Sequence, residues 1–226
     1  LGAPLDLAMH GGLMLAETPA EMTLLQQKAE IESKQGLKVE LFDRSQTLAT
    51  APYLSPNIAG ALFCPDEGHC NPRLLTPAYA RQAQQHGTDI FSNARVTAIQ
   101  RRKGQWHLDL SDRHNGQPGE PLCADTLLNA AGAWAGEIAT MANLHLPIFP
   151  VGLLMNVTEK TGPFIRHLIQ HVGRKLSMKQ VEDGNLFIVG GWPAHLQQQR
   201  CQWLSDSSPF IDPDTLRNIL ATAGAI

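Results

Sequence analysis

The chain has 226 residues, 43% of them hydrophobic and 17% charged, and its formal net charge at pH 7 is −3. This length can bury a sizeable core as one large domain or two smaller ones, and the composition is ordinary for a globular protein. The weak acidic balance gives no electrostatic reason to expect a nucleic-acid partner. No stretch approaches the ~18 uninterrupted apolar residues of a membrane-spanning helix.

Cysteine and histidine spacing argues against a metal centre. Cys64, Cys70, Cys123 and Cys201 are widely spread and form no Cys-x-x-Cys pair, and the nine histidines show neither His-x-His nor His-Glu-x-x-His spacing. We therefore expect reduced thiols in a cytoplasmic protein, with no disulfide framework and no bound metal.

The first third of the chain alternates between strand and helix patterns. Thr18 and Pro19 supply an N-cap and a first-turn proline, and Glu21 stands at the capping-box offset. Asn71 and Pro72 repeat the cap-and-proline start. These signals predict strands at residues 11–16, 39–42 and 59–64, helices at 18–36 and 72–85, and an irregular, proline-containing connection between 42 and 59.

The middle of the chain has mostly strand patterns. The segment 105–110 alternates apolar and polar residues, and the polar, glycine-containing segment 111–121 is typical of a hairpin loop. The predicted elements are strands at residues 88–91, 95–101, 105–110 and 123–129, followed by a helix at 133–143.

The junction before that helix is the most informative stretch of the sequence. A short apolar strand at residues 126–129 passes through Ala130-Ala-Gly-Ala133, four residues with almost no side-chain bulk, into the helix. A ligand can therefore approach the main chain closely, and the start of a helix favours a phosphate. The same pattern is typical of a close crossing between a helix and a strand, so the residues alone leave both interpretations open.

Pro147 and Pro150 mark the best candidate for a domain boundary. Beyond them, Asp183-Gly184 is a strong hairpin signal between two strands. The predicted elements are an antiparallel meander of strands at residues 152–158, 174–180 and 185–189, a polar helix at 194–205 and a final helix from residue 214.

Several motifs occur in a characteristic order: Gly11-Gly-Leu-Met-Leu15, Gly60-Ala-Leu-Phe63, Asp66-Glu-Gly-His-Cys-Asn-Pro72, Arg95-Val96, Asn129-Ala-Ala-Gly-Ala-Trp134, Pro150, Val157-Thr-Glu159, Lys179-Gln180, Asp183-Gly184 and Gly190-Gly191. In this order they resemble the FAD-dependent amine and amino-acid oxidoreductases of the D-amino-acid oxidase type, which include sarcosine and glycine oxidases. The most specific element is the run that ends at Trp134. The later motifs, together with Gly191-Trp-Pro-Ala194, further resemble the opine oxidase and hydrogen cyanide synthase subunits.

This resemblance implies an α+β fold, with a mixed, mostly antiparallel sheet in a substrate domain and a partial FAD-binding domain. Residues 1–71 and 146–226 are expected to form the substrate domain, and residues 72–145 to belong to the FAD-binding domain. The implied reaction oxidises the C–N bond of an amine or amino acid: FAD accepts a hydride from the C–H next to the nitrogen, and water hydrolyses the imine.

For the cofactor, the resemblance implies contacts through the main chain of Val96, through Ala131 and Gly132, and through Trp134 at the same corner. The structural alternatives are an ordinary strand residue for Val96 and a core side chain for Trp134.

For the substrate, the resemblance implies contacts from polar residues of the strands that cover the flavin. Asn156, Lys179 and Gln180 are the candidates for binding a carboxylate or an amine, and a solvated strand residue is the alternative for Lys179. His10 and His69 lie beside glycines in expected loops and are further candidates for a general base. No catalytic residue is assigned.

Two departures from the family pattern limit this expectation. No Gly-x-Gly-x-x-Gly occurs in the sequence, so the main pyrophosphate cradle is missing, and Gly152 stands where many relatives carry an arginine. The chain also begins without Met and ends within a predicted helix. We therefore expect a piece of a longer flavoenzyme that binds FAD weakly or not at all and is inactive by itself.

Two other functions remain open. A non-catalytic binding or subunit-docking module derived from such an enzyme would present the predicted polar helix around residues 197–200 to a partner subunit. A different nucleotide-binding enzyme could share only the corner between strand and helix.

Overall fold

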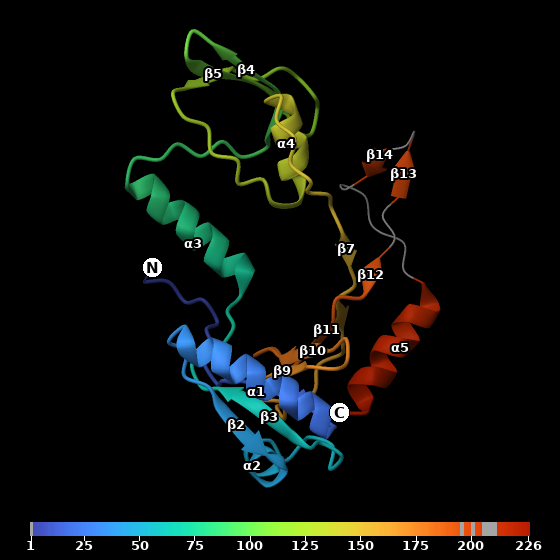
Figure 1. Ribbon diagram of the computed structural model, residues 1–226. Helices are drawn as coiled ribbons and strands as arrows, with labels where there is room; N and C mark the ends of the chain where they lie inside the picture. The colour runs from blue at the N-terminus through green and yellow to red at the C-terminus, as the bar shows by residue number, and fades with distance from the viewer. Residues whose placement is uncertain (1, 195–196, 200–201, 205–211) are drawn as a thin grey trace. The chain divides into compact units, whose positions relative to one another are not determined.

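The computed structural model describes residues 2–194, 197–199, 202–204 and 212–226. The chain falls into two compact units (Figure 1). Unit 1 comprises Leu1–Tyr79, Gly152–His195 and Ser208–Ile226, and unit 2 comprises Ala80–Val151 and Leu196–Ser207. Unit 1 therefore contains both the N-terminal and the C-terminal part of the chain, and unit 2 is built mainly from the middle of the chain.

Unit 1 is built on a seven-stranded mixed sheet. Strand β1 pairs parallel with β9, and all other neighbouring strands pair antiparallel. The strand order is β2-β3-β1-β9-β10-β11-β8, with β1 at Gly12–Ala16, β2 at Glu40–Asp43, β3 at Gly60–Cys64, β8 at Asn156–Val157, β9 at Leu168–His171, β10 at Ser177–Gln180 and β11 at Leu186–Val189. This sheet and its flanking helices confirm the expected α+β class.

The first helix forms as its sequence predicts. Helix α1 (Pro19–Lys34) begins at Thr18, whose hydroxyl accepts a hydrogen bond from the N–H of Glu21 at 3.2 Å. The Glu21 carboxylate accepts in return from the N–H of Thr18 at 3.0 Å. This capping box satisfies two N–H groups that have no partner within the helix.

A second helix lies where an irregular connection is expected. Helix α2 (Arg44–Thr50) begins at Asp43, whose carboxylate accepts from the N–H of Gln46 at 2.8 Å, and the Gln46 side chain accepts from the N–H of Asp43 at 2.9 Å. The expectation holds only for the part that contains Pro52 and Pro56. The Asp-x-x-Gln spacing is the signal from which this helix could have been predicted.

One face of the unit 1 sheet carries the main core. Alternate strand residues such as Leu13, Leu15 and Ile169 are fully buried there. Helix α5 (Pro213–Gly224) adds Ile219 to the same cluster. Burying each such side chain stabilises the fold by about 1.5–3 kcal/mol.

The opposite face of the sheet is covered in part. Helix α1 contacts β1, β2 and β3 (Figure 1). It packs Leu25 against Ala16 and Leu62. The side chains that β10 and β11 direct to this face are only half-buried in unit 1. Helix α1 therefore covers the part of this face formed by β1, β2 and β3 and leaves the part formed by β10 and β11 accessible.

The later strands differ from expectation in two ways. Strand β9 is not predicted by its sequence. The predicted strand at residues 152–158 is instead two short strands, because β7 (Gly152–Leu153) pairs with β12 (Pro193–Ala194) while β8 pairs with β11. The change of partner occurs at Leu154, which is buried in the core.

The hairpin between β10 and β11 is confirmed. Asp183 and Gly184 lie in its turn, and Gly184 has φ +93°, a value that favours glycine. Strand β10 begins at Ser177 rather than at Arg174, because the N–H of Leu176 bonds to the carbonyl of Arg174 in a tight turn.

Unit 2 contains a three-stranded antiparallel sheet. Helix α3 (Pro72–Gln85) forms as predicted and leads from unit 1 into unit 2. The helices of the unit's second half are a short 3-10 helix, η1 (Gly132–Trp134), and α4 (Ala135–Met141), which packs against β4. The strands are β4 at Ala94–Arg102, β5 at Gln105–Asp112 and β6 at Leu122–Ala124.

One predicted strand of unit 2 does not form, and another is shortened. Residues 88–91 and 126–129 have no strand pairing, and the expected strand at 123–129 is reduced to β6. Phe91 is 58% exposed and Leu128 is 85% exposed. Both segments have strand-like composition, but a strand needs a hydrogen-bonding neighbour, and the described part of the unit supplies none for them.

The predicted polar helix at residues 194–205 is also wrong over its described part. Ala194 belongs to β12, and Gln197–Gln199 (β13) pairs antiparallel with Gln202–Leu204 (β14). The positions between these strands lie outside the described residues. A glutamine-rich segment without a helix cap takes its structure from its pairing partner, which periodicity does not report.

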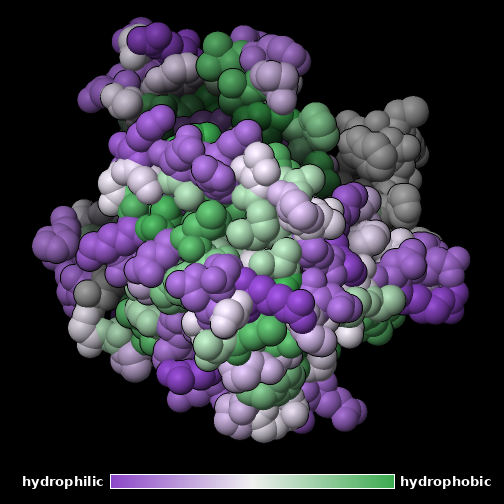
Figure 2. All heavy atoms as spheres, turned by 60° about the horizontal axis from the view of Figure 1, so that its bottom comes forward, coloured by the Kyte–Doolittle hydropathy of each residue, from purple (hydrophilic) through white to green (hydrophobic). Residues whose placement is uncertain are grey.

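The described surface mixes polar and apolar residues. In the space-filling view, green and purple residues alternate across the face toward the viewer (Figure 2). Among the described helices, none combines the length and apolar character needed to cross a membrane. Cys64, Cys70 and Cys123 are free thiols.

Candidate functional site

Strand register divides the three predicted substrate residues between the two faces of the unit 1 sheet. Lys179 pairs with Phe187, which pairs with Val157. Asn156 pairs with Ile188, and Ile188 pairs with the residue before Lys179 in β10. Gln180 is the residue after Lys179 in the same strand. Side chains alternate between faces along a strand, so Lys179 lies on one face and Asn156 and Gln180 lie on the other.

The face that carries Lys179 is the one that α1 covers only in part. We call its accessible part the open half-face. The ammonium of Lys179 lies 6.0 Å from the centre of the Phe187 ring. Such a cation above an aromatic ring gives the surface both a charge and a flat apolar area. The open half-face consists of Gln170, Ser177, Lys179, Phe187, Val189 and Val157, in two cross-strand rows.

The open half-face ends in a hollow of about 340 Å³. Three of its lining residues, Gln170, Ser177 and Val189, belong to the half-face, and Arg174 lies on its rim. The guanidinium of Arg174 donates two hydrogen bonds to the carboxylate of Glu17, at 2.6 and 2.7 Å. This two-pronged pair fixes the orientation of Arg174.

A buried histidine holds the loop that forms this rim. The Nδ1 atom of His171 accepts hydrogen bonds from the N–H groups of Gly173 and Arg174, both at 3.0 Å, so the proton of the neutral ring is on Nε2. Nε2 is fully buried, lies 3.4 Å from the Glu17 carboxylate and makes no hydrogen bond. The sequence gives no sign of this role, which depends on a turn that only the fold creates.

The pKa of His171 is lowered. Burial is the main cause, and it outweighs the carboxylates of Glu21 and Glu17, which act in the opposite direction, while Arg174 lowers the pKa further. His171 is therefore neutral at physiological pH, as its acceptor role at Nδ1 requires.

Gln180 has a structural role in unit 1. Its side-chain oxygen accepts from the N–H groups of Phe164 and Ile165 at 2.8 and 3.0 Å. Its side-chain nitrogen donates to the carbonyls of Gly162 and Gly184 at 3.0 and 3.2 Å. All four hydrogen-bonding positions of the amide are thus occupied by the main chain. Contact with a substrate stays a prediction for Gln180 and Asn156.

The corner predicted to face a cofactor lies in unit 2. The side-chain nitrogen of Asn129 donates to the carbonyl of Ala135 at 2.9 Å, and its oxygen accepts from the N–H of Ala131 at 3.3 Å. Asn129 therefore ties the two ends of the corner together, a role that an Asn two residues before a turn suggests. Trp134 is 42% exposed at the same corner.

The main chain of this corner is open. Gly132 has φ +55°, and nothing lies within 4 Å of the position where a Cβ would stand. A flat or charged ligand group can therefore lie directly against Ala131 and Gly132, which fits the flank of a dinucleotide such as FAD. Bulky side chains do not fill the corner.

Val96 lies in unit 2, as does the corner around Gly132. The pairing of β4 with β5 shifts register between Val96 and Ala98, which is a β-bulge, and α4 packs against β4. Bulges redirect a strand locally and are frequent beside ligand sites. The structure thus places Val96, Ala131, Gly132 and Trp134 in unit 2, whereas the substrate candidates lie in unit 1.

The chain belongs to the DAO family of FAD dependent oxidoreductases, whose family model matches residues 1–225. A curated relative, a hydrogen cyanide synthase subunit of Pseudomonas protegens, is 32% identical over 124 residues, which are 54% of this chain and 28% of that protein. The matched segment therefore spans less than a third of that relative's length.

Solved structures show the same fold. Glycine oxidase from Geobacillus kaustophilus matches with a TM-score of 0.77 at 20% identity, over 98% of this chain and 55% of that one. L-proline dehydrogenase from P. horikoshii matches with a TM-score of 0.80 at 17% identity, over 98% of this chain and 57% of that one.

Proposed function

We propose that this chain is the greater part of the substrate domain and a portion of the FAD domain of an enzyme that oxidises the C–N bond of an amino acid or amine. The observation that carries the proposal is the family match over residues 1–225. Residues 1–71 and 146–226 form the substrate domain in this proposal, and residues 72–145 belong to the FAD domain.

In the proposed enzyme, Val96, Ala131, Gly132 and Trp134 contact the cofactor. When bound, FAD accepts the hydride from the carbon next to the substrate nitrogen. The openness of the Gly132 main chain supports this assignment, because a Cβ-bearing residue could not offer bare backbone to the cofactor. The sequence contains no Gly-x-Gly-x-x-Gly, so the remaining cradle has to come from another segment.

The open half-face supports the substrate assignment of Lys179. An ammonium beside an apolar ring would bind a substrate carboxylate and leave the substrate's apolar part against Phe187. Asn156 and Gln180 remain proposed contacts, but their position on the opposite face makes Lys179 the strongest of the three candidates. A cytoplasmic location stays part of the proposal and rests on the absence of Cys-x-x-Cys spacing in the sequence and on the free thiols of Cys64, Cys70 and Cys123.

The Lys179 assignment is tested in the complete gene product. Lys179→Met should raise the KM for a carboxylate-bearing amine substrate about tenfold, because it removes one charge-assisted contact. The control is Lys160→Met, since Lys160 lies at an exposed position 3.9 Å from Asp183. An unchanged KM in Lys179→Met would overturn the role of Lys179 while leaving the family assignment intact.

A subunit of a larger enzyme is the second candidate. It is favoured by the likeness to a protein that is itself named a subunit. The polar helix that would have supported docking is absent from the described residues 197–199 and 202–204, which form strands. Size-exclusion chromatography of the complete gene product with its co-purifying proteins tests this alternative, and elution of an active single chain would exclude it.

A further inference from the structure

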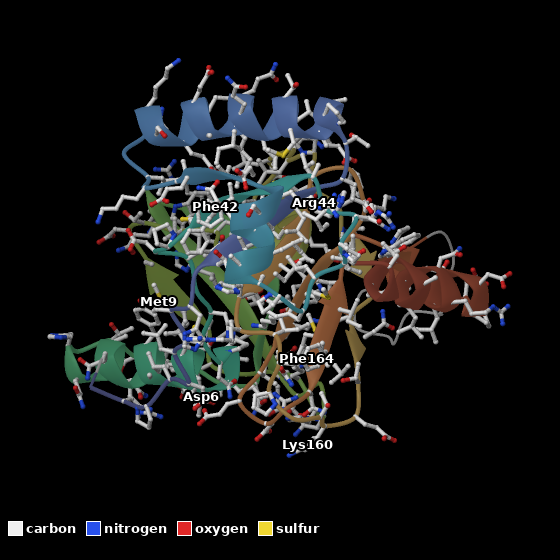
Figure 3. The ribbon with its side chains drawn as sticks, turned by 90° about the horizontal axis from the view of Figure 1, so that it is seen from below. Asp6, Met9, Phe42, Arg44, Lys160 and Phe164 are labelled. Carbon is white, nitrogen blue, oxygen red and sulfur yellow. The ribbon has the colours of Figure 1, made fainter. Side chains whose placement is uncertain are left out.

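A second, larger hollow lies in unit 1, with a volume of about 550 Å³. Its lining shares no residue with the hollow at the open half-face. Four parts of the chain form its walls: the N-terminal segment 6–10, the loop 161–166, the turn of the β10–β11 hairpin and His69. Asp6 and Phe164, labelled in Figure 3, mark the first two of these segments.

The walls of this hollow are held by hydrogen bonds. Ala8 and His69 exchange two backbone hydrogen bonds of 2.9 Å, and the Asn71 side chain donates to the carboxylate of Asp6 at 2.9 Å. The amide of Gln180 fixes the loop to the hairpin turn, as described above. The N–H of Thr161 adds a bond of 3.0 Å to the carbonyl of Gly184. The hollow is therefore formed before any ligand arrives.

The uncommitted polar groups on these walls are mainly donors. In the described part of the chain, the side chains of Arg166, His10 and His69 make neither a hydrogen bond nor an ion pair. Two of the three lining carboxylates are engaged, since Asp6 binds Asn71 and Asp183 lies 3.9 Å from the ammonium of Lys160. A guanidinium, two imidazoles and the exposed carboxylate of Glu182 thus remain, so donor side chains outnumber the one uncommitted carboxylate.

We propose that this hollow binds a small molecule through its anionic group, a carboxylate or a phosphate, with Arg166 as the main contact and His10 and His69 as additional donors. The planar guanidinium matches both oxyanions, and the volume suits a small-molecule ligand. The site differs from the hollow at the open half-face and needs no FAD. Of the proposed substrate contacts, Gln180 alone lines it, and main-chain groups occupy all four hydrogen-bonding positions of that amide.

The ionisation of His69 gives the proposed site a pH dependence. Burial, followed by the positive charges of Lys179 and His10, lowers the pKa of His69, so the ring is neutral near pH 7. Protonation adds a positive charge beside the bound anion. Anion binding is therefore stronger at lower pH, and its strengthening reports on His69 rather than on Arg166.

The proposal is tested by titrating the whole chain with succinate and, separately, with inorganic phosphate, followed by NMR chemical shifts or calorimetry. Arg166→Gln should weaken binding about tenfold, and His69→Gln should remove most of the pH dependence. Arg166 is exposed, so its substitution should leave the fold intact, which circular dichroism checks. Lys34→Gln, at an exposed position of α1 outside the lining, should bind like the unmodified chain.

The two probes distinguish the ligand class. Binding of succinate alone assigns a carboxylate, binding of phosphate alone assigns a phosphate, and binding of both assigns a general anion site. The proposal is overturned if neither probe binds at about 10 mM, a concentration that detects even very weak sites. It is also overturned if Arg166→Gln binds as tightly as the unmodified chain.

Discussion

Two residues shape the candidate sites through the main chain rather than through direct chemistry. His171 receives two N–H groups on one ring nitrogen and so holds the loop beside the open half-face. Gly132 adopts a left-handed conformation that opens the corner in unit 2. The roles of His171 and Gly132 each lead to a prediction that a substitution of that residue can test.

Acidification should destabilise the fold through His171. Its pKa is lower in the folded chain than in the unfolded chain, so the stabilisation is complete above the unfolded value of about 6.5 and is lost as the pH falls toward the folded value. In that window the unfolding free energy should fall by up to about 1.4 kcal/mol per pH unit.

Urea unfolding at a series of pH values measures this effect. His171→Leu should flatten the pH dependence, whereas the exposed His86→Leu should leave it as in the unmodified chain. A slope that is the same with and without His171 would contradict the assigned role.

Gly132→Ala should destabilise the chain by about 1 kcal/mol, because a Cβ is strained in the left-handed conformation. No atom lies close enough to clash, so the cost comes from the backbone alone. The matched control is Gly162→Ala, since Gly162 has free space and no positive φ. Equal unfolding midpoints for the two variants would contradict this account.

At the scale of elements, hydrogen bonds between side chain and main chain decide where segments begin and how they are joined. Gln180 connects the β10–β11 hairpin with the loop before β9, and Asp43 starts α2. Neither arrangement depends on a large apolar area.

Gln180→Ala should lower the unfolding free energy by about 2 kcal/mol, because four main-chain groups lose their partner and two of the four hydrogen bonds, to Ile165 and Gly184, are partly buried. Hydrogen exchange of the Phe164 and Ile165 amides should accelerate together. Gln26→Ala, at an exposed position of α1, is the control and should change neither measurement. Slow exchange retained at both amides in Gln180→Ala would exclude the bracing role.

Asp43→Ala should cost about 1 kcal/mol by removing the N-cap of α2, and Asp43→Asn should restore most of it, because asparagine caps equally well. Thermal unfolding of the two variants compares them directly. If both variants melt alike, the cap is not what starts this helix.

The elements that sequence alone predicts correctly are those with local signals. Thr18 and Glu21 mark the start of α1, and Asp183-Gly184 marks the hairpin, because each device lies within a few residues of the chain. The segments 88–91, 126–129 and 194–205 fail for the opposite reason: their structure depends on a distant partner.

The candidate site also contains features with a local sequence signal and features that depend on distant parts of the chain. The small residues around Gly132 indicate an open corner in advance, since their lack of bulk is visible in the sequence. The roles of His171 and Asn129, and the separation of Lys179 from Gln180 on opposite faces, depend on a turn or a strand register that only the folded chain defines.

At the scale of the whole molecule, the cofactor candidates and the substrate candidates lie in different units. An oxidoreductase of this family needs both, and the sequence holds no Gly-x-Gly-x-x-Gly to complete the cofactor site. The purified chain is therefore expected to show no turnover of glycine, sarcosine or an opine in an oxidase or dye-reduction assay. Detectable turnover would contradict the proposal that the chain is part of a longer enzyme.

The visible absorption spectrum of the complete gene product is the most direct test of the central claim, that this chain is the substrate-binding part of an FAD-dependent amine or amino-acid oxidoreductase. The account predicts a bound flavin whose visible absorbance disappears when the matching amine is added without oxygen. A complete product that neither retains nor takes up FAD, or whose flavin no amine or amino acid reduces, would contradict it.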